Sequence, residues 1–141
     1  MSRAAGYDYF EVAADVGVKA WGSTLPEAYA QAGLGVFALI VDPASVEARQ
    51  SREVSAQGES QEALLVNWLN ECLYVHEIEG FVVRRIEFPV FEAERVHSLL
   101  WGEDLDPARH RLGTVVKAAT FHQLRIGRGQ GEWEIYVILD I

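Results

Sequence analysis

The hydrophobic positions change their period along the chain, from helical spacing in the first half to alternation in the second. Apolar residues recur three and four positions apart over 25–39 and again over 65–76, which predicts two amphipathic helices. Thr24 and Ser60 stand where the N-caps of these helices should fall. The Asp42-Pro43 pair should end the first helix, because the residue before a proline avoids helical backbone.

Shorter apolar stretches predict strands. They are 7–13, 16–21, 46–56, 81–91, 94–101, 113–126 and 132–140. Pro89 favours an edge strand or a bulge, since proline cannot donate to a ladder. The stretch 102–111 should be a polar loop, and 127–131 a hairpin turn between the last two strands. Helices grouped early and strands grouped late predict one α+β domain over 1–141, with two main helices packed on an antiparallel or mixed sheet.

The charge balance bears on which partners the protein can have. The net charge is −9, and Lys19 and Lys117 are the only lysines. A protein that binds nucleic acid unaided usually presents a basic face, because phosphate contacts supply most of the nonspecific affinity. We therefore expect weak direct binding to RNA. The acidity suits docking onto a basic partner, and it would equally serve only to keep the protein in solution.

Cysteine usage and the N-terminal sequence bear on where the protein works. Cys72 is the single cysteine, which excludes an internal disulfide and fits a reducing compartment. The start of the chain is too polar for a secretory signal, and no apolar run reaches the length of a membrane span. We expect a cytoplasmic protein that makes no use of a membrane.

Familiar catalytic motifs are absent from the sequence. The glycines of 127–131 resemble a phosphate loop only superficially, because a strand rather than a helix should follow them. There is no Gly-x-Ser-x-Gly elbow, and the four histidines lack the spacing of a metal-ligating pair. One of them, His122, is expected in a strand beside Thr120.

Two aspartates stand at the ends of apolar stretches, where an ionised carboxylate is costly unless it is paired or binds a metal. Asp15 precedes a short strand, Asp140 ends the apolar run 135–139, and Ile141 adds the terminal carboxylate. If the strands are neighbours, three carboxylates could converge into an oxygen site suited to Ca²⁺, Mg²⁺ or Mn²⁺. Alternatively, Asp15 caps a turn and Asp140 lies in solvent.

Lys117 lies inside a predicted strand, within an apolar stretch where lysine is unfavourable. One interpretation is a charge that protects an edge strand against unwanted pairing. The other is a cation held for a partner or an anion. The sequence favours neither over the other.

Several segments together resemble the archease family over nearly the whole chain, in the family's order and spacing. They are Ala14-Asp15-Val16-Gly17-Val18-Lys19-Ala20-Trp21-Gly22, Leu25-Pro26-Glu27-Ala28-Tyr29, Leu64-Leu65-Val66-Asn67-Trp68-Leu69-Asn70-Glu71, Gly102-Glu103, His110, Val116-Lys117-Ala118-Ala119-Thr120-Phe121-His122 and Val137-Ile138-Leu139-Asp140-Ile141. The resemblance implies an archease-like fold and an accessory protein rather than an enzyme. Archeases assist the RtcB-type RNA ligase of tRNA splicing and RNA repair, promoting its guanylylation and its multiple turnover.

The resemblance also implies a site. A divalent ion, in the first place Ca²⁺ and otherwise Mg²⁺ or Mn²⁺, would be held by Asp15, Asp140 and Ile141. Candidates for contact with the ligase, through which RNA would be reached, are Lys117, His122 and His110. One departure is visible: Val12-Ala13 stands where archeases usually carry His-Thr, so a polar neighbour of the site is missing.

Two other functions would use the same chain. One is a small metal-dependent phosphoester hydrolase, although no general base accompanies the carboxylates. It would be indicated by hydrolysis in the isolated protein that Asp15→Ala abolishes. The other is a chaperone-like binder of apolar surfaces, which suppression of aggregation of unrelated proteins without metal would indicate.

Overall fold

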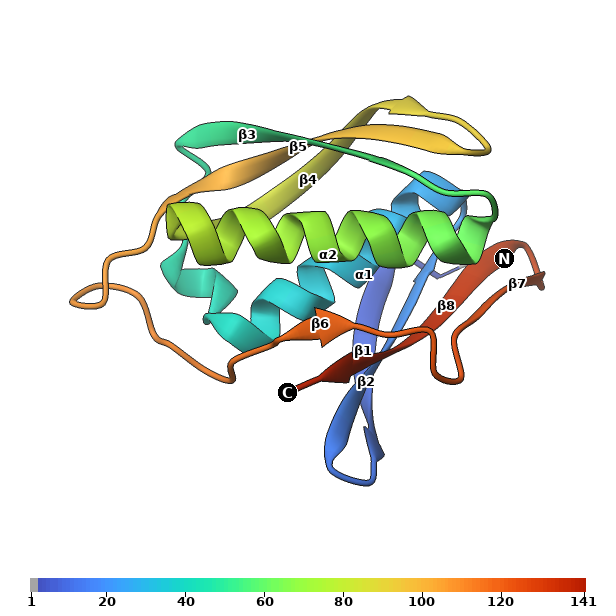
Figure 1. Cartoon of the computed structure of the whole chain (residues 1–141), viewed down its shortest axis with the longest axis horizontal. Coiled ribbons are helices and arrows are strands. Elements are labelled where there is room, and N and C mark those ends of the chain that lie inside the picture. Colours follow the sequence, from blue (N-terminus) through green and yellow to red (C-terminus); the bar gives the residue numbers. More distant parts are fainter. Residues whose placement is uncertain (1–2) are drawn as a thin grey trace.

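The computed structural model describes residues 3–141, in which two antiparallel sheets lie on either side of two α-helices (Figure 1). The elements are β1 (Gly6–Val12), β2 (Asp15–Gly22), α1 (Leu25–Ile40), a 3-10 turn (Pro43–Ser45), β3 (Gln50–Gln57), α2 (Gln61–Glu79), β4 (Phe81–Phe91), β5 (Arg95–Asp104), β6 (Ala118–Ala119), β7 (Arg125–Gly129) and β8 (Glu132–Asp140). One sheet has the order β1-β2-β8-β6, with β7 also paired to β8, and the other has the order β3-β5-β4. The predicted α+β class is confirmed.

The helix ends follow the sequence signals. The Thr24 hydroxyl accepts a hydrogen bond from the Glu27 backbone N–H at 3.2 Å, and α1 ends at Ile40, just before the Asp42-Pro43 pair. In α2 the Ser60 hydroxyl accepts from the Ala63 N–H at 3.0 Å. Gly80 ends α2 with a φ of 63°, a left-handed conformation that glycine adopts without steric cost.

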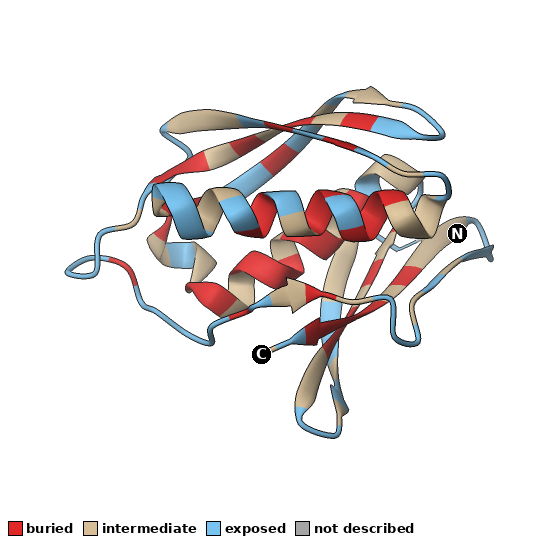
Figure 2. Ribbon diagram, viewed as in Figure 1, coloured by how far each residue is buried: buried red, intermediate tan, exposed pale blue. Residues whose placement is uncertain are grey.

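Both helices bury one side in a shared core. Each helix contacts strands of both sheets. Trp68, Tyr29 and Phe37 are among the largest fully buried side chains. The indole N–H of Trp68 donates to the Ser98 hydroxyl at 2.8 Å, so this buried polar group is satisfied. Exposed stretches recur along the opposite side of α2, as Figure 2 shows.

The stretch predicted as one strand over 113–126 differs in the structure. Only β6 and β7 form there, and the segment before β6 pairs with a helix end instead. The N–H groups of Gly113 and Thr114 donate to the carbonyls of Ile40 and Leu39 at 2.8 and 2.7 Å. These carbonyls belong to the last turn of α1, where no helical partner remains for them. The segment is therefore held by α1 rather than by a sheet.

Two further boundaries differ. The predicted strand 46–56 begins only at Gln50, because Pro43–Ser45 forms a 3-10 turn and the chain reaches the sheet late. The predicted polar loop 102–111 is wrong at its start, since β5 continues to Asp104 and pairs with the beginning of β4. The extra residues pair with Phe81, Val82 and Val83 of β4, all three of which are buried.

The Pro89 prediction is confirmed, and the predicted hairpin forms with a turn shorter than 127–131, since β7 continues to Gly129. β4 is an edge strand, and its pairing with β5 shifts between Glu87 and Val90, the interval that contains Pro89. β7 and β8 form a hairpin in which Gln130 and Gly131 take φ values of 55° and 78°. Positive φ at both central residues is the requirement of a tight hairpin turn with the twist of a sheet.

Candidate metal centre and its surroundings

Asp15 and Asp140 lie opposite each other on neighbouring strands. β2 and β8 are antiparallel and place Val16 opposite Leu139, so one step further along the same register Asp15 faces Asp140. Side chains opposed in this way share one face of a sheet, with β-carbons about 5 Å apart. The condition set by the sequence, that the two strands be neighbours, is therefore met.

The two carboxylates lie on the face of the sheet turned away from the helices. Val137 and Leu139 of β8 are buried in the core, so the alternation of the strand directs Asp140 to the other side. Asp15 is half-buried and Asp140 is exposed. Within residues 3–141 neither side chain makes a hydrogen bond or an ion pair with another group. Both carboxylates are thus uncommitted.

The donor chemistry fits a hard divalent cation, although the side chains alone do not complete a site. Across residues 3–141, no three side chains of His, Cys, Asp or Glu lie close enough to hold a metal ion. Asp15 and Asp140 supply only two such side chains. A third anionic ligand must come from elsewhere. Ile141 directly follows Asp140 in the chain and would supply an α-carboxylate where it is the last residue. Figure 1 shows the C-terminus beside β6.

The turn before Asp15 carries the departure noted in the sequence. Ala13 and Ala14 join β1 to β2, and Ala13 takes a φ of 46°. Val12 pairs with Asp15 across this turn. Because Val12 and Ala13 have no polar side-chain atoms, they supply no hydrogen bond that would orient the Asp15 carboxylate.

Lys117 reaches the same end of the sheet from the other side of Asp140. Its backbone N–H donates to the Asp140 carbonyl at 2.8 Å, and Ala118 pairs with Asp140 in β6. The lysine is exposed and, in the part of the chain that the structure describes, makes no ion pair. It stands directly before a two-residue edge strand rather than inside a longer strand.

Asn70 of α2 fixes that edge strand, a role that the sequence did not reveal. Its side-chain oxygen accepts from the Ala119 N–H at 2.8 Å, and its amide nitrogen donates to the Ala119 carbonyl at 3.2 Å. The amide thus satisfies both backbone groups of Ala119, as a neighbouring strand would. The sequence offered one weak signal for this role: Asn70 is a polar residue between the apolar positions Leu69 and Cys72 of the predicted helix.

His110 belongs to a separate, buried cluster. It is only 4% exposed, its Nδ1 accepts from the Asp106 N–H at 2.8 Å, and its Nε2 lies 3.1 Å from the Glu103 carboxylate. Nδ1 must be unprotonated to accept, so Nε2 carries the proton and donates to Glu103. With both nitrogens engaged and the ring buried, the imidazole presents no free polar atom to a partner, which contradicts the prediction of a partner contact at His110.

Glu103 is the centre of this cluster. Arg109 donates to both of its oxygens at 2.5 and 3.0 Å, and the Glu47 N–H donates at 2.7 Å. The hydrogen bonds from Arg109, together with those from Glu47 and His110, lower the pKa of Glu103 to about 2 despite its burial. The cluster has a structural role, because it links β5 to the segment before β3, which contains Glu47, and to the segment after β5, which contains Arg109 and His110.

His122 is exposed, but it lies in a turn between β6 and β7 rather than in a strand. Gln123 beside it takes a φ of 52°, and the His122 N–H donates to the Thr120 hydroxyl at 3.3 Å. The turn explains why the predicted strand breaks here. His122 remains accessible for contact with a partner.

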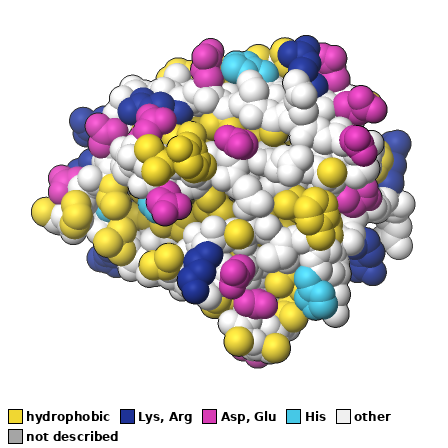
Figure 3. Space-filling view, viewed as in Figure 1, with side chains coloured by type: hydrophobic (Ala, Val, Ile, Leu, Met, Phe, Trp, Pro, Cys, Tyr) yellow, Lys and Arg dark blue, Asp and Glu magenta, His cyan; other side chains and the backbone are white. Residues whose placement is uncertain are grey.

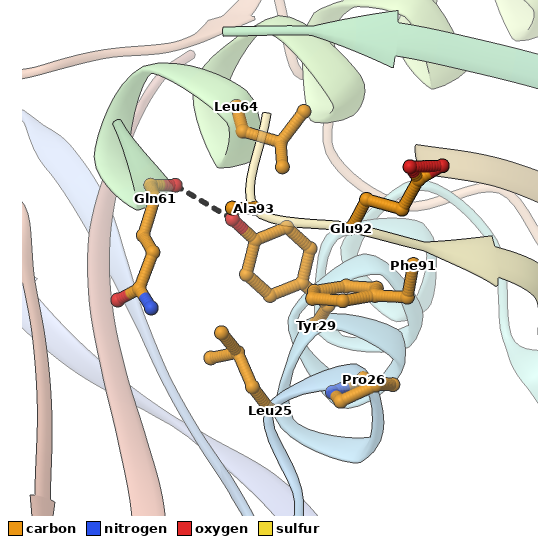
Figure 4. Close-up of a pocket in the computed structure, with 8 residues that line it drawn as sticks. All are labelled: Leu25, Pro26, Tyr29, Gln61, Leu64, Phe91, Glu92 and Ala93. Atoms are coloured by element: carbon orange, nitrogen blue, oxygen red, sulfur yellow. Dashed lines mark hydrogen bonds between the residues drawn. The ribbon is translucent and has the colours of Figure 1, made fainter. Parts of the chain in front are cut away.

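Among the hollows in residues 3–141, two lie beside the helix ends. A groove of about 690 Å³ runs between the C-terminal end of α2 and the segment 112–117, and Lys117 is at its edge. A smaller pocket of about 350 Å³ lies at the N-terminal ends of the helices. In Figure 4 the Tyr29 ring lies between Leu25 and Phe91, and its hydroxyl donates to the Gln61 carbonyl at 2.6 Å. Neither hollow is lined by Asp15 or Asp140.

Comparison with known proteins identifies the family to which this chain belongs. Residues 7–141 match the Archease protein family (MTH1598/TM1083). The archease of Pyrococcus abyssi is 36% identical over 139 residues, covering 96% of this chain and 98% of the relative. The archease of Danio rerio is 34% identical and covers 96% and 85%. The chain therefore belongs to the archease family.

Solved structures agree with this assignment. The solution structure of protein 1598 from Methanobacterium thermoautotrophicum matches with a TM-score of 0.78 at 31% identity, covering 96% of this chain and 99% of the other. The crystal structure of an archease from Thermotoga maritima, described as a possible chaperone, matches with a TM-score of 0.64 at 17% identity, covering 100% and 98%. At that identity the second match shows the fold alone. Within residues 3–141, no helix is long and apolar enough to cross a membrane.

Proposed function

We propose that this protein is a metal-binding accessory protein of an RtcB-type RNA ligase, and that it promotes guanylylation and multiple turnover of the ligase. Membership of the archease family supports the proposal. The observation that carries it is the opposition of Asp15 and Asp140 on β2 and β8. Uncommitted carboxylates repel each other unless a cation lies between them, so this arrangement suits cation binding.

The proposed ion is Ca²⁺, with Mg²⁺ and Mn²⁺ as alternatives, because all the donors are oxygens. When bound, the ion would supply positive charge to the converging carboxylates. Asp15 and Asp140 would hold it with their side chains, and Ile141 with its α-carboxylate. This last ligand requires Ile141 to be the final residue of the protein.

The proposed contacts with the ligase use two exposed side chains, Lys117 and His122. RNA would be reached through the ligase, because a net charge of −9 opposes direct binding to phosphates. A cytoplasmic site of action is part of the proposal, since the lone Cys72 is buried and unpaired.

The test is a ligase assay with the purified protein, the RNA ligase of the same organism, GTP and Ca²⁺. We expect the protein to increase covalent ligase–GMP and to permit more than one joining event per ligase. Asp15→Asn removes one charge while keeping the side-chain shape, and it should reduce both effects. Asp8→Asn, an exposed aspartate on the neighbouring strand β1, is the matched control and should behave as the unchanged protein.

Two outcomes would contradict the proposal. One is that neither guanylylation nor turnover responds to the protein. The other is hydrolysis of phosphoesters by the isolated protein that Asp15→Ala abolishes, which would instead indicate a metal-dependent hydrolase.

A further inference from the structure

An apolar groove that reaches Lys117 has the features of a docking site for a protein segment. It lies between α2 and the segment between β5 and β6, and its volume is about 690 Å³. Its lining includes Leu73 of α2, Gly80 directly after α2, Leu105 after β5, and Leu112 and Val115 of the later segment. Figure 3 shows hydrophobic side chains gathered on this side of the molecule, around the C-terminal end of α2.

The exposed apolar side chains of the molecule concentrate around this groove. Residues 3–141 contain six large hydrophobic residues that are strongly exposed, and two of them, Leu112 (57%) and Val115 (75%), line the groove. Two more, Tyr74 (59%) and Ile78 (63%), are four residues apart and so share one face of α2, and each directly follows a residue that lines the groove, Leu73 and Glu77. A contiguous apolar surface of this kind on an acidic protein marks an interaction site.

The charges in the groove define what can occupy it. Glu77 lines the groove on α2 and Lys117 lines it on the opposite segment. Neither makes an ion pair within residues 3–141, so both charges are free to meet a partner. An occupant therefore needs apolar side chains at its centre, a basic side chain for Glu77 and an acidic one for Lys117. An anionic membrane does not fit, because it would be repelled by a net charge of −9.

Lys117 connects the groove with the candidate metal centre. The Lys117 side chain lines its edge, and the Lys117 backbone N–H is bonded to the Asp140 carbonyl at 2.8 Å. A segment held in the groove would keep the body of its own protein next to Asp15 and Asp140. We propose that the groove binds an apolar segment of the RNA ligase that carries one basic and one acidic side chain, and so positions the carboxylates at the ligase. This rests on the proposed function.

Direct binding between the purified protein and the RNA ligase of the same organism, measured by titration calorimetry without RNA or GTP, tests the assignment. Val115→Asp places a carboxylate in the apolar groove at a position that is already exposed, so the fold should survive. We expect the dissociation constant to rise about tenfold or more. Glu77→Lys should weaken binding in the same direction. Gln130→Asp adds the same charge in the β7–β8 turn, far from the groove in Figure 1, and should change nothing.

The outcomes separate the groove from the proposed function. If the unchanged protein binds and stimulates the ligase, and both groove variants match it, the groove assignment is overturned while the function stands. If the unchanged protein does not bind the ligase, both fall. Sedimentation velocity gives the remaining outcome: a dimer of the unchanged protein that Val115→Asp dissociates would show that a second copy occupies the groove, and would overturn the proposal.

Discussion

At the scale of single residues, Asn70 links the helical layer to the candidate site. Its amide satisfies both backbone groups of Ala119, and β6 in turn pairs with the end of β8, where Asp140 lies. The residue does not touch the carboxylates. It holds the edge strand that lies against one of them, and it is therefore a positioning residue.

Asn70→Ala should lower both stability and metal affinity. Removing the amide leaves two partly buried backbone groups without a partner, which should reduce the free energy of unfolding by about 1–3 kcal/mol. The loosened β6 should also weaken Ca²⁺ binding in a calorimetric titration. Asn67→Ala is the matched control, because Asn67 lies one turn earlier and donates to the Gln57 carbonyl of β3 at 2.8 Å. It should lose stability but keep its Ca²⁺ affinity. Equal Ca²⁺ affinity in the two variants would show that Asn70 is only structural.

At the scale of elements, the end of β8 is the sensitive point of the candidate site. Asp140 is the last residue of the strand, and Ile141 packs partly against the core with its side chain. The backbone of the chain end is thus held close to the sheet. A terminal carboxylate here carries a full charge, whereas a peptide carbonyl in the same place is only a dipole.

A Gly-Ser-Gly-Ser extension after Ile141 should weaken Ca²⁺ binding by about tenfold or more. Loss of a group that only hydrogen-bonds to a metal ligand already lowers metal affinity by about tenfold, and the extension removes a proposed ligand itself. Deleting Ile141 should act in the same direction, because it moves the carboxylate to the preceding position, which points to the other face of the strand. Far-ultraviolet circular dichroism should stay unchanged. The same extension before Met1 is the control. Identical calorimetric affinities for both extended forms would exclude the terminal carboxylate as a ligand.

The segment between β5 and β6 shows where element prediction from the sequence fails. Its apolar residues predict a strand, but Gly113 and Thr114 donate to the carbonyls at the end of α1. The spacing of apolar residues indicates which faces of an element will be buried. It does not indicate which backbone N–H and C=O groups will lack a hydrogen-bond partner. The end of α1 offers such groups, and only the docking of the helix brings them to this segment.

At the scale of the whole molecule, acid should reveal the contribution of the Glu103 cluster. The pKa of Glu103 lies at about 2 in the folded protein, below the usual 4.5. Between these values the unfolded chain binds a proton at Glu103 and the folded protein does not. The stabilisation is therefore fully present above about pH 4.5 and is lost as the pH falls towards about 2.

Glu103→Gln should remove this part of the pH dependence. At pH 7 the variant should unfold more easily, by about 1–3 kcal/mol, because Arg109 and His110 lose a charged partner. The difference from the unchanged protein should shrink as the pH is lowered from 5 to 2 in denaturant titrations. Glu92→Gln breaks only an exposed pair with Arg95 and should cost little at any pH. A constant difference across the range would mean that Glu103 is not the titrating group.

The sequence by itself determined the parts of this protein that local chemistry controls. Thr24, Ser60 and Gly80 fix the helix ends through their own hydrogen bonds or backbone freedom, and Gly131 suits a tight turn because it takes a positive φ without steric cost. The matching motifs also placed the chain in the archease family. None of these features needs knowledge of which segments become neighbours.

The tertiary structure decided everything that depends on pairing. It placed β2 beside β8 and so set Asp15 opposite Asp140, and it buried His110 against Glu103, which the sequence had left available for a partner. Distant strands pair where their buried faces and unsatisfied backbone groups fit together. That fit is a property of the assembled core, and no local pattern of residues encodes it.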